Sequence, residues 1–129
     1  MQICDWLFYR MSKTLQHIVD SQTNAVWDTL CEIHTRLVRY NPPKIVLCNR
    51  LTRTAGKSYQ EENRIHLAAK FFAKHDANMR LVILPHELAH QADFNLFGLS
   101  EKKCGHGANW CMIMLQLGLA PNKYHSMTI

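Results

Sequence analysis

Apolar residues recur every three or four positions in the N-terminal third of the chain. They are Ile3, Trp6, Leu7, Met11, Leu15 and Ile18, and then Val26, Leu30, Ile33 and Leu37. This spacing matches one face of an α-helix, so it predicts two amphipathic helices. We expect Asp20 and Ser21 to interrupt the pattern and to cap the second helix, which Asn41-Pro42-Pro43 would end.

Shorter β-prone runs follow these two predicted helices. Residues 44–48 predict one strand, and residues 51–59 with residues 64–68 predict a hairpin around residues 60–63. Residues 69–75 predict a short helix that leads into the next element. We therefore predict an α+β fold in which helices pack on a short three-stranded sheet.

The apolar pattern of residues 81–97 predicts a mostly buried helix that Gly98 ends. Asp76 or Asn78 could cap its start. Pro85 lacks a backbone N–H and clashes with the carbonyl of Leu81, so we expect a kink or a late helix start just before residue 86.

A further helix is predicted over residues 108–117, where Trp110, Ile113, Met114 and Leu117 share one face. Residues 121–129 have no periodicity, and we expect this tail to be frayed.

Composition indicates one globular domain over residues 1–129. Hydrophobic residues make up 47% of the chain, and five Gly and four Pro are too few for a disordered segment. No apolar run reaches the ~18 residues of a membrane helix, and no leader pattern precedes the first predicted helix. We therefore expect a cytoplasmic protein with no membrane role.

Charge and cysteine content narrow the picture only slightly. The formal net charge of +5 is compatible with a polyanion partner such as nucleic acid, although an ordinary surface with a modest basic excess explains it equally well. Five cysteines form no C-x-x-C pair, which indicates core thiols in a reducing compartment.

The strongest chemical signal is the H-E-x-x-H pattern formed by His86, Glu87 and His90. Residues four apart on an α-helix lie about 40° apart around its axis, so both imidazoles project from one face. They can fill two of the four positions around a zinc ion. Glu87 lies on the adjoining side of the helix, too short to join them but able to act on a water molecule there.

A third protein ligand is required, and the downstream candidates are Asp93, Glu101, Cys104 and His106. Asp93 is on the same helix, about 10 Å of rise from His86, and suits a supporting role better. His106 stands between two glycines and opens the helix predicted at residues 108–117. We favour His106, and keep Glu101 and Cys104 as alternatives.

These motifs resemble the SprT/Spartan family of small zinc peptidases. The resemblance covers about residues 20–118 and is carried by Val82-Ile83-Leu84-Pro85, by the H-E-x-x-H pattern, and by Gly105-His106-Gly107-x-x-Trp110-x-x-x-Met114. It implies a zincin-type, DNA-associated metalloprotease domain with one Zn²⁺ per chain, held by His86, His90 and His106, and with Glu87 as general base. No zinc ribbon of paired cysteines precedes Ile129, so we expect DNA recognition to use the peptidase domain itself or another protein.

The predicted function is zinc-dependent cleavage of proteins. The resemblance implies substrates that are bound or crosslinked to DNA, with single-stranded or damaged DNA as a partner and a nuclear or nucleoid-associated location. A strand edge beside the metal helix could take the substrate backbone as an added strand, and Tyr59 or Tyr124 could donate to the developing oxyanion. Two alternatives stay open: a zinc-stabilised nucleic-acid-binding module without proteolysis, and a processing protease independent of DNA.

Overall fold

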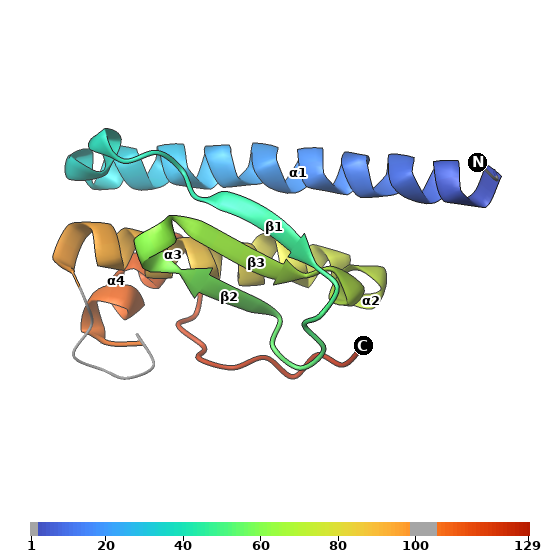
Figure 1. Cartoon of the computed structure of the whole chain (residues 1–129). Coiled ribbons are helices and arrows are strands. Elements are labelled where there is room, and N and C mark those ends of the chain that lie inside the picture. The colour runs from blue at the N-terminus through green and yellow to red at the C-terminus, as the bar shows by residue number, and fades with distance from the viewer. Residues whose placement is uncertain (1–2, 99–105) are drawn as a thin grey trace.

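The computed structural model describes the backbone of residues 3–98 and 106–129, with side chains from residue 13 onward (Figure 1). Its helices are α1 (Ile3–Ile33), α2 (Phe72–Asn78), α3 (Leu84–Phe97) and α4 (Ala108–Gln116), and its strands are β1 (Lys44–Cys48), β2 (Gly56–Tyr59) and β3 (Arg64–Ala68). The prediction of an α+β fold with helices packed on a three-stranded sheet is confirmed.

Helix α1 is one continuous helix, so the predicted break at Asp20 and Ser21 is wrong. Val19, Thr23 and Trp27 follow one another at intervals of four residues, and all three are buried on the same face. Asp20 lies on the exposed face, where its carboxylate accepts a hydrogen bond from Gln16 Nε2 at 3.0 Å. Burial of one unbroken face therefore outweighs the local capping signal, as tertiary packing commonly does.

The sheet has the strand order β1-β3-β2, with β1 parallel and β2 antiparallel to β3. The hairpin prediction is confirmed for residues 56–68, where a 3₁₀ turn at Gln60–Glu62 and a left-handed Asn63 (φ 52°) join β2 to β3. Residues 51–55 are not a strand. This arrangement leaves β2 at one edge of the sheet, on the side of α3.

A nearly continuous helical run leads from α2 to α3, and Pro85 sets where α3 begins. Helix α3 starts at Leu84, directly after a π-helical turn at Met79–Ile83, so the predicted late start is confirmed. The predicted caps are wrong: neither Asp76 nor Asn78 caps α3, and the Asp76 carboxylate instead accepts two hydrogen bonds from the Arg80 guanidinium. Gly98 ends the helix as predicted, with φ of 81°.

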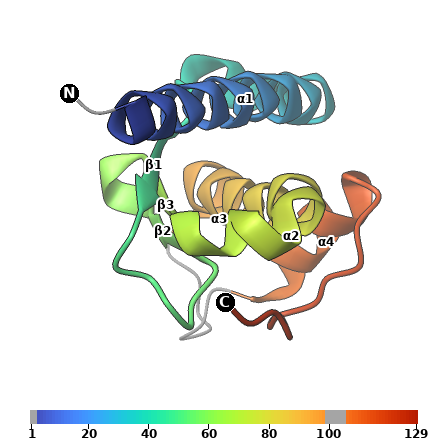
Figure 2. The same cartoon turned by 90° about the vertical axis from the view of Figure 1, so that its right-hand side faces the viewer.

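Helix α3 is the centre of the molecule. It contacts α1, α4 and β2, and Figure 2 shows it between α1 and the elements that follow it in the chain. Its Leu84, Leu88, Ala89 and Ala92 are fully buried, together with Trp27 of α1 and Trp110 of α4. The metal-motif helix is therefore held by the core on several sides. Among the residues that the structure describes, no helix combines the length and apolarity needed to cross a membrane.

Candidate metal centre

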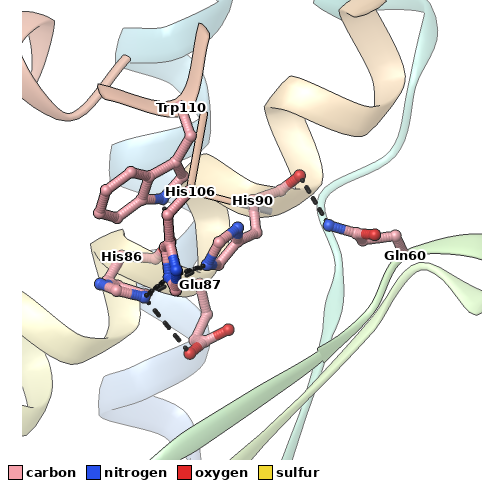
Figure 3. Close-up of polar contacts among 6 residues, drawn as sticks. All are labelled: Gln60, His86, Glu87, His90, His106 and Trp110. Carbon is pink, nitrogen blue, oxygen red and sulfur yellow. Dashed lines mark hydrogen bonds and ion pairs between the residues drawn. The ribbon is translucent and has the colours of Figure 1, made fainter. Parts of the chain in front are cut away.

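Three histidines from two parts of the chain meet at one point (Figure 3). His86 and His90 project from successive turns of α3, and His106 comes from the segment that enters α4. The Nε2 atom of His90 lies 3.2 Å from that of His86 and 3.0 Å from that of His106, and the third separation is 3.3 Å. All three predicted ligands are therefore brought together.

The spacing of these nitrogen atoms fits a bound metal ion. Tetrahedral zinc with Zn–N bonds of about 2.0–2.1 Å places its ligand nitrogens about 3.3 Å apart. The observed separations of 3.0–3.3 Å are close to that value. The three nitrogens converge on one point. A cation at that point can accept the lone pairs of all three rings at once, which satisfies them better than any set of hydrogen bonds among the rings does.

The surroundings keep two of these imidazoles, His86 and His106, in the neutral form that binds a metal. Burial lowers the pKa of His86 to about 4, with the His106 ring adding to the shift and a backbone hydrogen bond to Asn122 opposing it. Burial also lowers the pKa of His106, and the positive charge of Lys123 acts in the same direction. Neutral imidazole is the metal-binding form, so both rings are ready at neutral pH without losing a proton.

Glu87 lies beside this triad rather than in it. Its side chain is buried, and Oε1 is 4.0 Å from Nε2 of His86. Burial raises the pKa of Glu87 to about 8 in the metal-free protein. A cation held by the three imidazoles would favour the ionised carboxylate, because opposite charges at short range stabilise each other.

The backbone of β2 packs directly against Glu87 at Gly56. A Cβ atom on Gly56 would lie 2.9 Å from Cγ and 3.2 Å from Oε1 of Glu87. Real Cβ contacts are longer than this, so only glycine leaves the carboxylate in its present position. The sequence gives no sign of this constraint, because Gly56 and Glu87 are distant in the chain.

Trp110 forms a wall against all three histidines. Its ring is stacked on His90 with an interplanar angle of 17°, and it meets His86 and His106 edge to face at centroid distances of 4.8 and 4.6 Å. The indole Nε1–H donates to the backbone carbonyl of His86 at 3.3 Å. The helical spacing predicts Trp110 as a core residue, and its complete burial confirms this prediction. The spacing does not predict its contact with the histidine rings.

Two glutamines tie the turn after β2 to the metal-motif helix. Gln60 Nε2 donates to the carbonyl of His90 at 3.3 Å, and Gln91 Nε2 donates to the carbonyl of Gln60 at 3.0 Å. These bonds fix the far end of β2 relative to the histidines, as Gly56 does at its near end.

The centre opens into a cleft of about 1090 Å³. Residues 52–58 line one side, residues 122–129 line the other, and the three histidines and Glu87 are on its floor. The tail has no regular secondary structure, but it is not frayed as predicted: His125 Nε2 bonds to the carbonyl of Arg53 at 2.8 Å, and His75 Nε2 to the carbonyl of Thr128 at 2.7 Å.

The structure also separates the remaining candidates. Asp93 is buried on α3, and it is not in the one metal-ligating group found among the described residues. The alternatives Glu101 and Cys104 lie outside those residues. Tyr124 lines the cleft, with its ring 6.5 Å from that of His106, whereas the ring of Tyr59 packs against His66 at 4.7 Å.

Fold and site together define a class: an α+β protein in which one helix and one following segment supply three imidazoles to a candidate metal centre. Comparison with known families narrows this class. The model of the SprT-like family matches residues 24–128, so the chain belongs to the SprT-like family. This confirms the resemblance seen in the motifs and indicates a metalloprotease-type domain.

A curated relative agrees with this assignment. The chain is 31% identical over 91 residues to Protein SprT of Glaesserella parasuis serovar 5 (strain SH0165). The match covers 70% of this chain and 56% of the relative, so the chain spans little more than half the length of that protein. No solved structure matches the chain.

Proposed function

We propose that this protein is a zinc-dependent endopeptidase of the zincin type. His86, His90 and His106 would hold the zinc ion, and Glu87 is the general base. The observation that carries the proposal is the position of a buried carboxylate, 4.0 Å from a ligand nitrogen, beside three imidazoles spaced for one metal ion. A site with purely structural zinc needs closed coordination and no base, whereas this centre opens into a cleft.

The proposed reaction divides between the ion and Glu87. A zinc ion held there supplies Lewis acidity, which lowers the pKa of water toward about 7 and polarises a peptide carbonyl. Glu87 accepts the proton of the attacking water and then returns it to the leaving nitrogen of the peptide. Its buried position suits both transfers, because burial keeps its proton affinity high and excludes competing water.

The free edge of β2 is suited to hold the substrate. Ala68 N–H donates to the carbonyl of Ala55 on the sheet side, and hydrogen-bonded and free positions alternate along an antiparallel strand. This alternation directs the backbone groups of Gly56 and Ser58 toward the free edge, which lines the cleft. An extended peptide can add to this edge as a further antiparallel strand and pass across the metal centre.

Tyr124 is the better of the two proposed oxyanion donors. It comes from the cleft wall next to His106, and its side chain is 84% exposed, so its hydroxyl is free to reach a substrate. The Arg64 guanidinium lies over the Tyr59 ring, 4.8 Å from its centroid, and Tyr59 is not among the residues that line the cleft. We therefore assign the donor role to Tyr124.

We further propose that the protein substrates are bound or crosslinked to DNA. Two facts support this proposal. The chain belongs to the SprT-like family, and the motif resemblance to SprT/Spartan peptidases implies DNA-associated substrates. The formal net charge of the chain is +5. A basic domain is attracted to nucleic acid, which would bring the cleft close to proteins held there.

Zinc content and self-cleavage test the proposal together. We expect one zinc per chain in the wild type and in Glu87→Gln, loss of zinc in His106→Ala, and full zinc in His17→Ala, an exposed histidine of α1. Cleavage should fall about 10²- to 10⁴-fold in Glu87→Gln. It should be unchanged in Glu32→Gln, which alters an exposed glutamate of α1.

Adding single-stranded DNA to the same assay separates the three readings. Cleavage that DNA stimulates supports the DNA-directed protease. Cleavage of equal rate with and without DNA favours a processing protease, and bound zinc without cleavage favours a binding module. Full cleavage by Glu87→Gln would show that the base is assigned to the wrong residue.

A further inference from the structure

The two walls of the cleft differ in how they are built. One wall consists of strand β2, which belongs to the sheet, and the residues before it, whereas residues 122–129, here called the tail segment, form the other. In Figure 1 the tail segment (red) runs below β2 and in the opposite direction. A peptide that adds to β2 in antiparallel orientation therefore lies between β2 and the tail segment, with backbone on both sides.

His125 fixes the tail segment to the opposite wall. Its Nε2–H donates to the carbonyl of Arg53 at 2.8 Å, and its Nδ1 accepts a hydrogen bond from the backbone N–H of Met127 at 3.1 Å. The ring also packs edge to face on Phe71, with a centroid distance of 5.3 Å. Because both ring nitrogens are engaged, the side chain has one tautomer and one orientation.

Helix α2 holds the rest of the tail segment. Asn78 Nδ2 donates to the Met127 sulfur at 3.0 Å, and Lys74 Nζ donates to the carbonyl of Ile129 at 3.0 Å. His75 completes the set through the carbonyl of Thr128. The tail segment is thus positioned by side chains from two distant parts of the chain, so the residues it presents to the cleft have defined places.

The charged side chains around the cleft are nearly all positive. Arg53 stands before β2 and Lys123 on the tail segment, and Glu87 is the one acidic side chain among the described residues that line the cleft. Lys57 also borders the cleft, but its Nζ lies over the Tyr59 ring, 5.2 Å from the centroid. Lys123 precedes Tyr124, whose ring is 6.5 Å from that of His106, and all three line the same cleft. A peptide between the walls therefore meets a cation on each side, and among the described residues the buried base is the one acidic side chain there.

We propose that this cleft selects extended peptides that carry Asp or Glu side chains next to the bond that is cut, and that Lys123 determines this specificity. The inference rests on the proposed peptidase function and adds a substrate class to it. The substrate carboxylates would pair with Lys123 on one wall and with Arg53 on the other. Pairing of opposite charges in a partly enclosed cleft raises both the rate of encounter and the affinity.

The expected effect follows from the exposure of these cations. Arg53 and Lys123 are exposed, so each pair contributes only a modest amount, and removing one cation should weaken the preference about threefold. Salt should weaken it too, because the Debye length falls to about 3 Å at 1 M ionic strength.

The test uses internally quenched peptides that differ only in Glu, Gln or Lys at the positions flanking the central bond. The zinc-loaded wild type, Lys123→Gln, Arg53→Gln and the double variant are compared for kcat/KM on each peptide. Lys70→Gln is the matched control, since it removes an exposed positive charge that does not line the cleft. Binding of each peptide to zinc-loaded Glu87→Gln is measured by fluorescence anisotropy.

The proposal requires that kcat/KM at low salt is highest for the Glu peptide, lower for the Gln peptide and lowest for the Lys peptide. The differences between peptides should lie mainly in KM. The preference should shrink about threefold in each single variant, shrink further in the double variant, and stay in Lys70→Gln. Equal cleavage of the Glu and Gln peptides would overturn the proposal while leaving the peptidase function intact. A preference that all variants lose equally, Lys70→Gln included, would also overturn it, because net charge would then be the cause.

Two further outcomes separate the possible roles of these cations. Selective binding of the Glu peptide to Glu87→Gln, without cleavage of any peptide by the wild type, supports the acidic-peptide preference and contradicts the peptidase function. If Arg53→Gln and Lys123→Gln lose affinity for a single-stranded oligonucleotide and keep the discrimination between peptides, the cations bind nucleic acid and the proposal is wrong.

Discussion

Gly56→Ala is the most informative single change at this site, because it displaces Glu87 without touching any charged or metal-binding group. The added Cβ would lie 2.9 Å from Cγ of Glu87. Ordinary carbon–carbon contacts are about 3.5–4.0 Å, so the Glu87 side chain has to retreat by roughly 0.6–1 Å. Misplacement of a catalytic group by about 1 Å can lower turnover about 10²-fold. We therefore expect kcat to fall between about tenfold and a hundredfold.

The effect of Gly56→Ala on stability should be small by comparison. Gly56 does not have a positive φ, so alanine fits its backbone and stabilises the fold by about 0.4–1 kcal/mol through the unfolded chain. Overpacking against Glu87 costs about 1–3 kcal/mol, which leaves a net loss of at most about 2.6 kcal/mol.

Three measurements on the same Gly56→Ala protein distinguish the possible causes of lost activity: a displaced Glu87, a lost zinc ion or a destabilised fold. They are kcat on a peptide substrate, zinc per chain, and the free energy of unfolding in urea. We expect low kcat with full zinc and a small loss of stability. Wild-type turnover would refute the reasoning, and loss of zinc would place the damage at the histidines instead of at Glu87.

The remaining predictions concern the Trp110 indole against the histidines, the titration of His86, and the tail segment. Trp110→Ala should lower the free energy of unfolding by about 3–5 kcal/mol and weaken zinc binding, because the indole is fully buried against all three imidazoles. Trp110→Phe should keep most of the stability and most of the zinc affinity. Urea unfolding and zinc titration measure these two quantities. The next prediction concerns metal-free Glu87→Gln protein, in which the opposing titration of Glu87 is absent. Its free energy of unfolding should fall by roughly 3 kcal/mol as the pH falls from 6.5 to about 4, because His86 binds a proton in the unfolded state more readily than in the folded state. A free energy of unfolding that does not change with pH would show that His86 is not buried in solution. His125→Ala should free the tail segment, so that limited proteolysis cuts it faster than in the wild type while zinc content is unchanged.

The site could be predicted from sequence where its geometry is local. His86 and His90 share a helix face by periodicity alone, and His106 precedes a helix whose apolar face had to pack on the same core. The structure brings these three residues together, with their Nε2 atoms 3.0–3.3 Å apart. Their role as metal ligands and the role of Glu87 as base stay predictions.

The contacts that could not be predicted all join distant segments. Gly56 meets Glu87 through space, and His125 reaches the backbone of Arg53, 72 residues away. The acceptors in the bonds that hold the tail segment are mostly backbone carbonyls, which every residue has, so no side-chain pattern indicates them. The break expected at Asp20 failed for the opposite reason: a local capping signal was present, but burial of Trp27 and its neighbours decided the outcome.

The π-helical turn at Met79–Ile83 has a consequence for the relative rotation of two functional surfaces. Helix α2 carries His75 and Asn78, which hold the tail segment, and α3 carries His86 and His90. Each residue advances an α-helix by about 100°, so the one extra residue of a π turn resets the angle between the two groups by about that amount. Deleting a single residue there would turn the histidines by about that angle, away from the cleft wall that α2 supports. The turn therefore acts as a fixed angular offset that aligns the metal centre with the wall opposite β2.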